Sequence, residues 1–223
     1  MLTDFSYTGV SWAINGGTKR VRLIDDWHKS NASIENTEKV PTKISYENRE
    51  PLHWGYDVTV TETSFKWFKL LLDPHRAAQV PGPVVSSERL LGSLVKTAEQ
   101  VAADYLEQVW NYTMSDISRN QGEGWESRHH LRVVLTVPAI WSPAAKDRTL
   151  KAARAAGLPE NISLVSEPEA AALKVLRERN QDRTVQVCSS NSSIADKFTQ
   201  FAGRGLFRGL RCWRRNCSKS KKP

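Results

Sequence analysis

The sequence predicts an α/β protein, with one folded region followed by a basic C-terminal segment. The first observation is the order strand, helix, strand, helix between residues 131 and 179, in which short loops join the elements. The second is an apolar stripe at helical spacing between residues 86 and 110. The third is the separation of charge, because the last 21 residues carry eight Lys and Arg residues and no acid.

The N-terminal part of the folded region predicts short strands. Residues 9–14 and 20–27 are of strand length, and Gly16-Gly17 between them is a hairpin turn signal. An edge strand is expected around residues 43–46, and another strand over WGYDVTVT, residues 54–61.

The middle of the folded region predicts a long amphipathic helix over residues 86–110, with Ser86 or Ser87 as its N-cap. The preceding run FKWFKLLLD, residues 65–73, fits either a short helix or a buried strand, and periodicity does not decide between them.

A β-α-β-α unit follows. Residues 131–137 form a β-branched apolar strand that Pro138 stops, and a helix then runs from the N-cap Ser142 to Gly157. A second strand covers residues 162–165, and Pro168 begins the last helix, which ends near Arg179. Short connections through a helix imply that the two strands are parallel neighbours.

Glu167 lies just past the carboxyl end of the second of these strands. Ligands of open α/β sheets bind at such edges, so this acid is a candidate for facing a substrate or a metal-bound water. The alternative is that Glu167 only stabilises the helix that Pro168 opens, and the local sequence by itself favours this alternative.

The net charge of +8 belongs to the C-terminal segment. Removing its eight basic residues from the 32 Lys and Arg leaves as many as the 24 acidic residues. The segment mixes Arg with aromatic residues, which suits nucleic-acid contact, but a solvated and disordered cationic end is the preferred interpretation. No long apolar run and no signal peptide are recognised, so we expect a cytoplasmic protein without a membrane partner.

Three motifs in the β-α-β-α unit resemble the heat shock protein 70 family. They are Val137-Pro138-Ala139, Ala156-Gly157-Leu158 and Glu167-Pro168-Glu169-Ala170-Ala171-Ala172. DFSYTGVSWAI near the N-terminus is similar to the opening D-F-G-T-T-Y-S-G-V-S-W-A of that family. FKWFKLLLDP resembles the divergent fungal branch of the family, whose ATPase domain is actin-like.

The resemblance implies a truncated first lobe of a ribonuclease-H-like, actin-like ATPase over residues 1–185, with a mixed sheet and flanking helices. Residues 186–223 would be a low-complexity basic tail. The family binds ATP with Mg²⁺, and matching its motifs makes Glu167 the catalytic acid and Asp4 the residue that holds Mg²⁺ through water. Ser6, Tyr7 and Thr8 then stand with Asp4 as the cofactor-binding segment. Unfolded protein clients and co-chaperones are the partners that the resemblance implies.

Several features depart from the family pattern. Ser6 alone stands where the family has Gly-Thr-Thr, and the family's phosphate-reaching lysine is missing after Trp54-Gly55. The second phosphate loop, D-x-G-G-G-T, has no counterpart in VQVCSSNSSIADKFTQFAG. We therefore expect an ATP-binding ATPase-domain fragment whose hydrolysis is impaired or lost. The alternative is a non-catalytic remnant or interaction module that binds no nucleotide.

Overall fold

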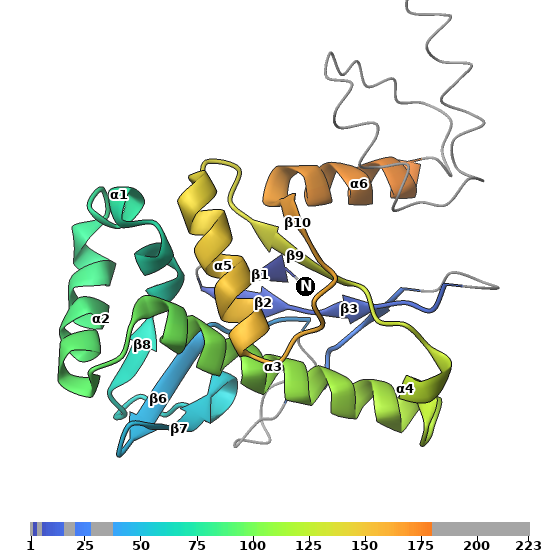
Figure 1. Cartoon of the computed structure of the whole chain (residues 1–223), viewed down its shortest axis with the longest axis horizontal. Helices are drawn as coiled ribbons and strands as arrows, with labels where there is room; N and C mark the ends of the chain where they lie inside the picture. Colours follow the sequence, from blue (N-terminus) through green and yellow to red (C-terminus); the bar gives the residue numbers. More distant parts are fainter. Residues whose placement is uncertain (1, 4–5, 16–20, 28–37, 180–223) are drawn as a thin grey trace, which may run out of the picture. The chain divides into compact units, whose positions relative to one another are not determined.

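The computed structural model describes residues 2–3, 6–15, 21–27 and 38–179 (Figure 1). The chain divides into two compact units, Met1–Lys174 and Val175–Pro223, and only residues 175–179 of the second are described. The predicted basic tail, Asp4 and the Gly16-Gly17 turn lie outside the described residues.

The described elements, in chain order, are β1 (Leu2–Thr3), β2 (Tyr7–Gly9), β3 (Ser11–Trp12), β4 (Arg22–Leu23), β5 (Val40–Pro41), β6 (Lys43–Glu47), β7 (Glu50–Trp54), η1 (Gly55–Asp57), β8 (Ser64–Lys66), η2 (Phe68–Leu72), α1 (Pro74–Ala77), α2 (Pro81–Leu94), α3 (Ala98–Gln121), α4 (Trp125–Arg128), β9 (Val133–Val137), α5 (Pro143–Ala155), β10 (Ile162–Ser166) and α6 (Glu167–Arg179).

The predicted α/β class is confirmed, with parallel and antiparallel pairing in the same fold. β9 and β10 are parallel, from Val133 beside Ile162 to Val137 beside Ser166. β3 pairs with β4 antiparallel, as the hairpin prediction requires. Antiparallel pairing also builds the sheets β1-β2-β5 and β7-β6-β8, and β1 lies beside β9. None of the helices in the described part of the chain combines the length and apolar character that a membrane crossing requires.

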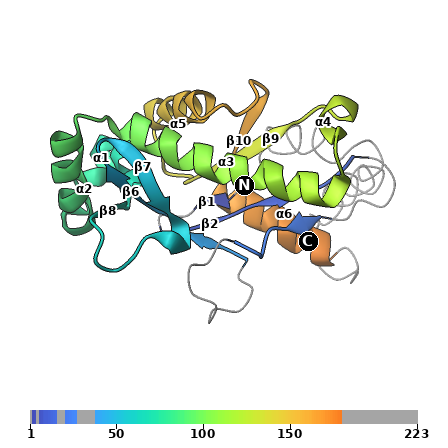
Figure 2. The same cartoon turned by 90° about the horizontal axis from the view of Figure 1, so that it is seen from below.

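α3 is the spine of the first unit. It extends from the sheet β7-β6-β8 to α4 (Figures 1 and 2), and α5 packs against it. Its Tyr105 ring contacts Phe68 at 5.5 Å and Trp54 at 6.2 Å between centroids, and its Tyr112 ring stacks on Trp27 at 5.1 Å. Each such aromatic pair contributes about 0.5–1.5 kcal/mol beyond the burial of its area. These contacts fix η2 and the segment after β4 against one helix.

The prediction of a single helix over residues 86–110 is wrong, because the chain forms the two helices α2 and α3 instead. Val95 takes a left-handed conformation at φ 55° and ψ 40°, which ends α2. Thr97 and Gln100 then form a capping box, in which each side chain accepts a hydrogen bond from the other residue's backbone N–H. Ser87 does not cap a helix, since its hydroxyl donates to the backbone oxygen of Lys66 at 2.6 Å. The apolar stripe continues across this break, so periodicity alone could not show it.

Two strand predictions in the middle of the chain are also corrected. The predicted edge strand is β6, which lies in the centre of β7-β6-β8. The predicted strand over residues 54–61 ends at Trp54, because Gly55 has φ 60° and turns the chain into η1. A Cβ at Gly55 would lie 2.5 Å from Val40 Cγ2, so the close approach also requires glycine. Residues 65–73 combine both alternatives, with the end of β8 followed by η2.

The end signals of α5 are confirmed. The Ser142 hydroxyl accepts a hydrogen bond from the Ala145 backbone N–H at 3.2 Å, and Pro143 occupies the first turn. Gly157 has φ 77°, the left-handed conformation that terminates a helix.

Replacing Val95 with glycine should stabilise the protein. A left-handed conformation costs a side-chain-bearing residue about 1–2 kcal/mol, and glycine loses about 0.5–1 kcal/mol through its freer unfolded chain. Because Val95 is 74% exposed, little packing is lost. Urea denaturation should therefore show Val95→Gly about 0.5–1 kcal/mol more stable than the wild type. Val85→Gly, in the interior of α2, is the matched control and should be destabilising.

Glu62 should make stability depend on pH below about pH 4.5. The hydroxyl of Ser45 donates to Glu62 Oε2 at 2.7 Å, and with the Thr59 and His53 hydrogen bonds it lowers the Glu62 pKa from its ordinary 4.5 to about 2. A lowered carboxyl pKa stabilises the fold fully above the unfolded pKa, and this contribution is lost as the pH falls toward the folded pKa.

The measurement compares the free energies of unfolding of the wild type and Glu62→Gln. Their difference should stay constant above about pH 5 and shrink as the pH falls from 4.5 toward 2. Ser45→Ala removes the largest cause of the lowered Glu62 pKa. In that background the pH range over which the Glu62 contribution to stability is lost should be narrower. A difference that does not change with pH would contradict the assignment.

Candidate functional site

A buried lysine and a carboxylate meet at the carboxyl end of the parallel strands. Lys69 Nζ lies 3.1 Å from Glu167 Oε1, and the two residues are 98 positions apart in the chain. The Lys69 side chain is 8% exposed and the Glu167 side chain 31% exposed. Nζ also lies 5.3 Å from the centre of the Trp141 ring, which gives a cation–π contact. The pair thus combines a sheltered cation with an acid that solvent can reach.

The local sequence explains how Lys69 reaches this position. Trp67 has a left-handed backbone at φ 61° and turns the chain from β8 into η2. Phe65 before the turn and Phe68 after it are both buried, and Phe68 packs against Tyr105 of α3. η2 is therefore anchored by its apolar side chains on the spine, and this anchoring carries the Lys69 side chain into the interior.

The contacts at the start of α6 show which residues cap this helix. The Ser166 hydroxyl accepts from the Glu169 backbone N–H at 3.3 Å, and the Glu169 carboxylate accepts from the Ser166 backbone N–H at 2.9 Å. Ser166 and Glu169 thus form the capping box of this helix. The Glu167 carboxylate instead points across to Lys69, so its main contact lies outside its own helix.

Two polar contacts tie η2 to α5. Asp73 is 2% exposed, and its Oδ2 accepts a hydrogen bond from the Ser142 backbone N–H at 3.2 Å. The Arg148 guanidinium donates to the backbone oxygen of Leu72 at 3.2 Å. Both contacts join the end of the segment that carries Lys69 to the helix that follows Trp141.

The other predicted site residues are not brought to this pair by the contacts of the described residues. Thr8 is fully buried, its hydroxyl is 2.9 Å from that of Thr42, and it accepts from the Tyr105 hydroxyl at 2.9 Å. Burial, above all, raises the pKa of Tyr105, so this hydroxyl stays protonated and donates. The backbone oxygen of Ser6 accepts from Thr42, and the Tyr7 side chain is 46% exposed. Their role with Asp4 as a cofactor-binding segment stays a prediction.

Lys69 was missed by the sequence analysis, which looked for a lysine after Trp54-Gly55. The available signal was a charged residue inside the apolar run FKWFKLLLD. A lysine within a buried segment needs a counter-charge or another strong partner. That requirement could have prompted a search for an acid near the sheet edge, where Glu167 stands.

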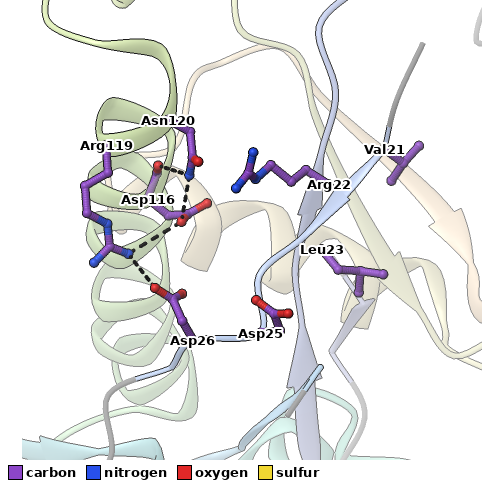
Figure 3. A pocket seen from close by; sticks show the side chains of 8 residues that line it. All are labelled: Val21, Arg22, Leu23, Asp25, Asp26, Asp116, Arg119 and Asn120. Atoms are coloured by element: carbon purple, nitrogen blue, oxygen red, sulfur yellow. Dashed lines mark hydrogen bonds and ion pairs between the residues drawn. The ribbon is translucent and has the colours of Figure 1, made fainter. Parts of the chain in front are cut away.

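A separate open pocket lies between the segment around β4 and the end of α3 (Figure 3). Its volume is about 500 Å³, and Arg119 on one wall bridges Asp26 at 3.1 Å and Asp116 at 3.5 Å. The Trp12 indole also donates to Asp116 at 2.9 Å. These contacts tie the hairpin to α3 and account for the polar groups on that wall. Among the described residues no cluster of three His, Cys, Asp or Glu side chains could hold a metal ion.

Glu167→Gln should destabilise the protein, because it removes the carboxylate that pairs with the buried Lys69 ammonium. Breaking a fully buried pair costs about 3–5 kcal/mol, and the partial exposure of Glu167 reduces the expected loss to about 2 kcal/mol. Urea denaturation should show that loss, and the double variant Lys69→Met with Glu167→Gln should recover most of it. Asp147→Asn breaks the exposed Asp147–Lys151 pair and should leave the free energy of unfolding almost unchanged. A double variant no more stable than Glu167→Gln would contradict this account.

Comparison with known proteins shows distant, partial similarity to the chaperone DnaK of the heat shock protein 70 family. The chain is 30% identical over 128 residues to the chaperone protein DnaK from each of two strains of Thermus thermophilus. It is 27% identical over 173 residues to the chaperone protein DnaK of Mycoplasmopsis synoviae. No protein-family model matches the chain.

The matched regions cover different shares of the two proteins. The matches span 57% of this chain for Thermus thermophilus and 76% for Mycoplasmopsis synoviae, but only 19% and 28% of those relatives. The chain therefore spans less than a third of the length of the relatives it matches. It is distantly similar to part of a chaperone of the heat shock protein 70 family.

Proposed function

We propose that this chain is a relative of the ATPase domain of DnaK that binds Mg-ATP phosphates beside Lys69 and Glu167. The observation that carries the proposal is the ion pair of buried Lys69 with partly exposed Glu167 at the carboxyl end of β9 and β10. We further propose the finer assignment to the first, ribonuclease-H-like lobe of an actin-like ATPase of the fungal branch, over residues 1–185. The segment FKWFKLLLDP, which resembles that branch, is the segment that carries Lys69.

The chemistry of the pair fits a phosphate ligand. A lysine ammonium is a compact point charge that neutralises phosphate oxygens, and Trp141 holds it from one side without a competing negative charge. The Glu167 carboxylate, nearly a third exposed, can accept a hydrogen bond from a water molecule beside the phosphate. Mg²⁺ brought with the nucleotide would supply further neutralisation of the phosphate charge. Among the described residues no protein cage for a metal exists, so water and phosphate would provide most of the ligands of that ion.

Hydrolysis is proposed to be slow or lost. Ser6 alone occupies the place of the family's Gly-Thr-Thr, and the neighbouring Thr8 hydroxyl is engaged with Thr42 and Tyr105. Fewer backbone and hydroxyl donors are then left to hold a transferring phosphoryl group. Client proteins, co-chaperones and a cytoplasmic location stay predictions from the resemblance, and DnaK is a chaperone by name.

The second candidate is a non-catalytic module that binds no nucleotide. The observation that favours it is that the Lys69 charge is already compensated by Glu167 at 3.1 Å. A phosphate would have to compete with this carboxylate for the ammonium group. A binding measurement distinguishes the two candidates directly.

Calorimetric titration of the full chain with Mg-ATP and with Mg-ADP tests the proposal. We expect saturable binding that Lys69→Ala weakens at least tenfold, because the variant lacks the cation that faces the phosphates. Asp147→Asn, a surface control on α5, should bind as the wild type does. Phosphate release by the wild type should remain at the background rate. Absence of binding in the wild type would support the second candidate. Equal binding by the wild type and Lys69→Ala would instead contradict the role proposed for Lys69.

A further inference from the structure

We propose that Asp73 is a positioning residue that holds Lys69 and Trp141 in register at the site. This inference rests on the proposed function for its biological meaning, but its geometry stands by itself. Asp73 follows η2 directly, and Ser142 follows Trp141 directly. The bond from the Ser142 backbone N–H to Asp73 Oδ2, at 3.2 Å, therefore joins the two segments that meet at the Lys69 ammonium.

The burial of Asp73 is costly and calls for an explanation. Its side chain is 2% exposed, and its Oδ1 has no hydrogen-bond partner among the described residues. Burying a polar atom without a partner costs about 1–3 kcal/mol, so an apolar residue would satisfy packing alone at lower cost. A carboxylate at this position makes sense if the bond to Ser142 has a role beyond filling space.

The position of Ser142 explains why a carboxylate can be held there. Ser142 is the N-cap of α5, a helix of 13 residues, and its own hydroxyl accepts from Ala145 N–H. The N-terminal end of a helix carries partial positive charge, which stabilises a nearby anion. Asp73 Oδ2 is thus anchored to the start of α5, and the packing of α5 against α3 fixes the position of that helix.

The hydrogen bond between Asp73 and Ser142 would determine where the Lys69 ammonium lies relative to Trp141 and Glu167. η2 fixes the root of the Lys69 side chain, and the loop before α5 fixes the Trp141 ring 5.3 Å from Nζ. A shift of one segment along the other would change that distance and the 3.1 Å contact with Glu167. Asp73 and the Arg148–Leu72 contact are the polar links that oppose such a shift, and of the two only Asp73 binds beside Trp141.

The test uses the full chain with ¹³C-labelled lysine. The ring current of Trp141 should displace the proton signal of the Lys69 side chain, which is assigned by its loss in Lys69→Arg. Asp73→Ala should remove at least half of that displacement. Asp73→Asn keeps an oxygen acceptor for the Ser142 N–H and should retain it. Asp116→Ala removes another buried carboxylate, whose partners are Trp12, Arg119 and Asn120, and should lower stability without moving the Lys69 signal.

The outcomes decide the proposal separately from the proposed function. A folded Asp73→Ala with an unchanged Lys69 signal would overturn it, as would equal changes in Asp73→Ala and Asp116→Ala. If Asp73→Ala does not fold, Asp73→Leu replaces it in the same comparison. If neither folds, hydrogen exchange of the wild type decides, because the Ser142 amide must exchange as slowly as the bonded Asp73 amide.

If the wild type binds no Mg-ATP, the proposed function fails while the comparison of Lys69 signals still holds. If it binds, Asp73→Ala should weaken binding at least tenfold.

Discussion

A lysine ammonium held inside the protein requires a compensating charge, and this requirement organises the fold around the site. Lys69 is 8% exposed, and removing an ammonium from water costs several kcal/mol unless a partner repays it. The partner is Glu167, 98 positions further along the chain. The first unit must therefore bring η2 to the carboxyl end of β10. Every element between them, from α1 to β10, has to allow that approach.

The spine helix α3 makes the approach possible. Tyr105 contacts Phe68 of η2 on one face, and α5 packs along the same helix. Since η2 and α5 rest on one rigid element, the short polar links between them can set the detailed geometry. The apolar contacts supply most of the stabilisation. The hydrogen bonds from Arg148 to Leu72 and from Ser142 to Asp73 are directional, so they set how η2 and α5 are oriented toward each other. The site is thus built mainly on helices and strands, with Trp141 in the loop between them.

The contrast between the two halves of the proposed nucleotide site is informative. At the edge of β9 and β10 the groups that a phosphate needs are present, with a cation and a carboxylate held by packed elements. In the N-terminal segment the Thr8 hydroxyl is engaged with two other hydroxyls in the core. Similarity to DnaK covers less than a third of the length of that protein. This asymmetry is why binding and hydrolysis are separated in the proposal.

Local signals in the sequence determined the elements whose ends are chemically marked. Ser142, Pro143 and Gly157 delimit α5, and a β-branched run before Pro138 marks β9, because caps and proline act on their immediate neighbours. The parallel pairing of β9 and β10 followed from their short helical connection. The break between α2 and α3 was not predicted, since the same apolar spacing continues across Val95 and the capping box of Thr97 and Gln100 was not recognised.

The candidate site divides in the same way. The sequence by itself marked Glu167 through its position after a strand and through the motif Glu167-Pro168, which are local features. The sequence by itself did not identify Lys69. It also did not show that Ser166 and Glu169 form the capping box of α6, while the Glu167 carboxylate contacts another segment. Ion pairing depends on distance in space, and residues 98 positions apart carry no local trace of each other. Tertiary structure decided that contact, because the burial of Phe65 and Phe68 places Lys69 beside the acid at the end of β10.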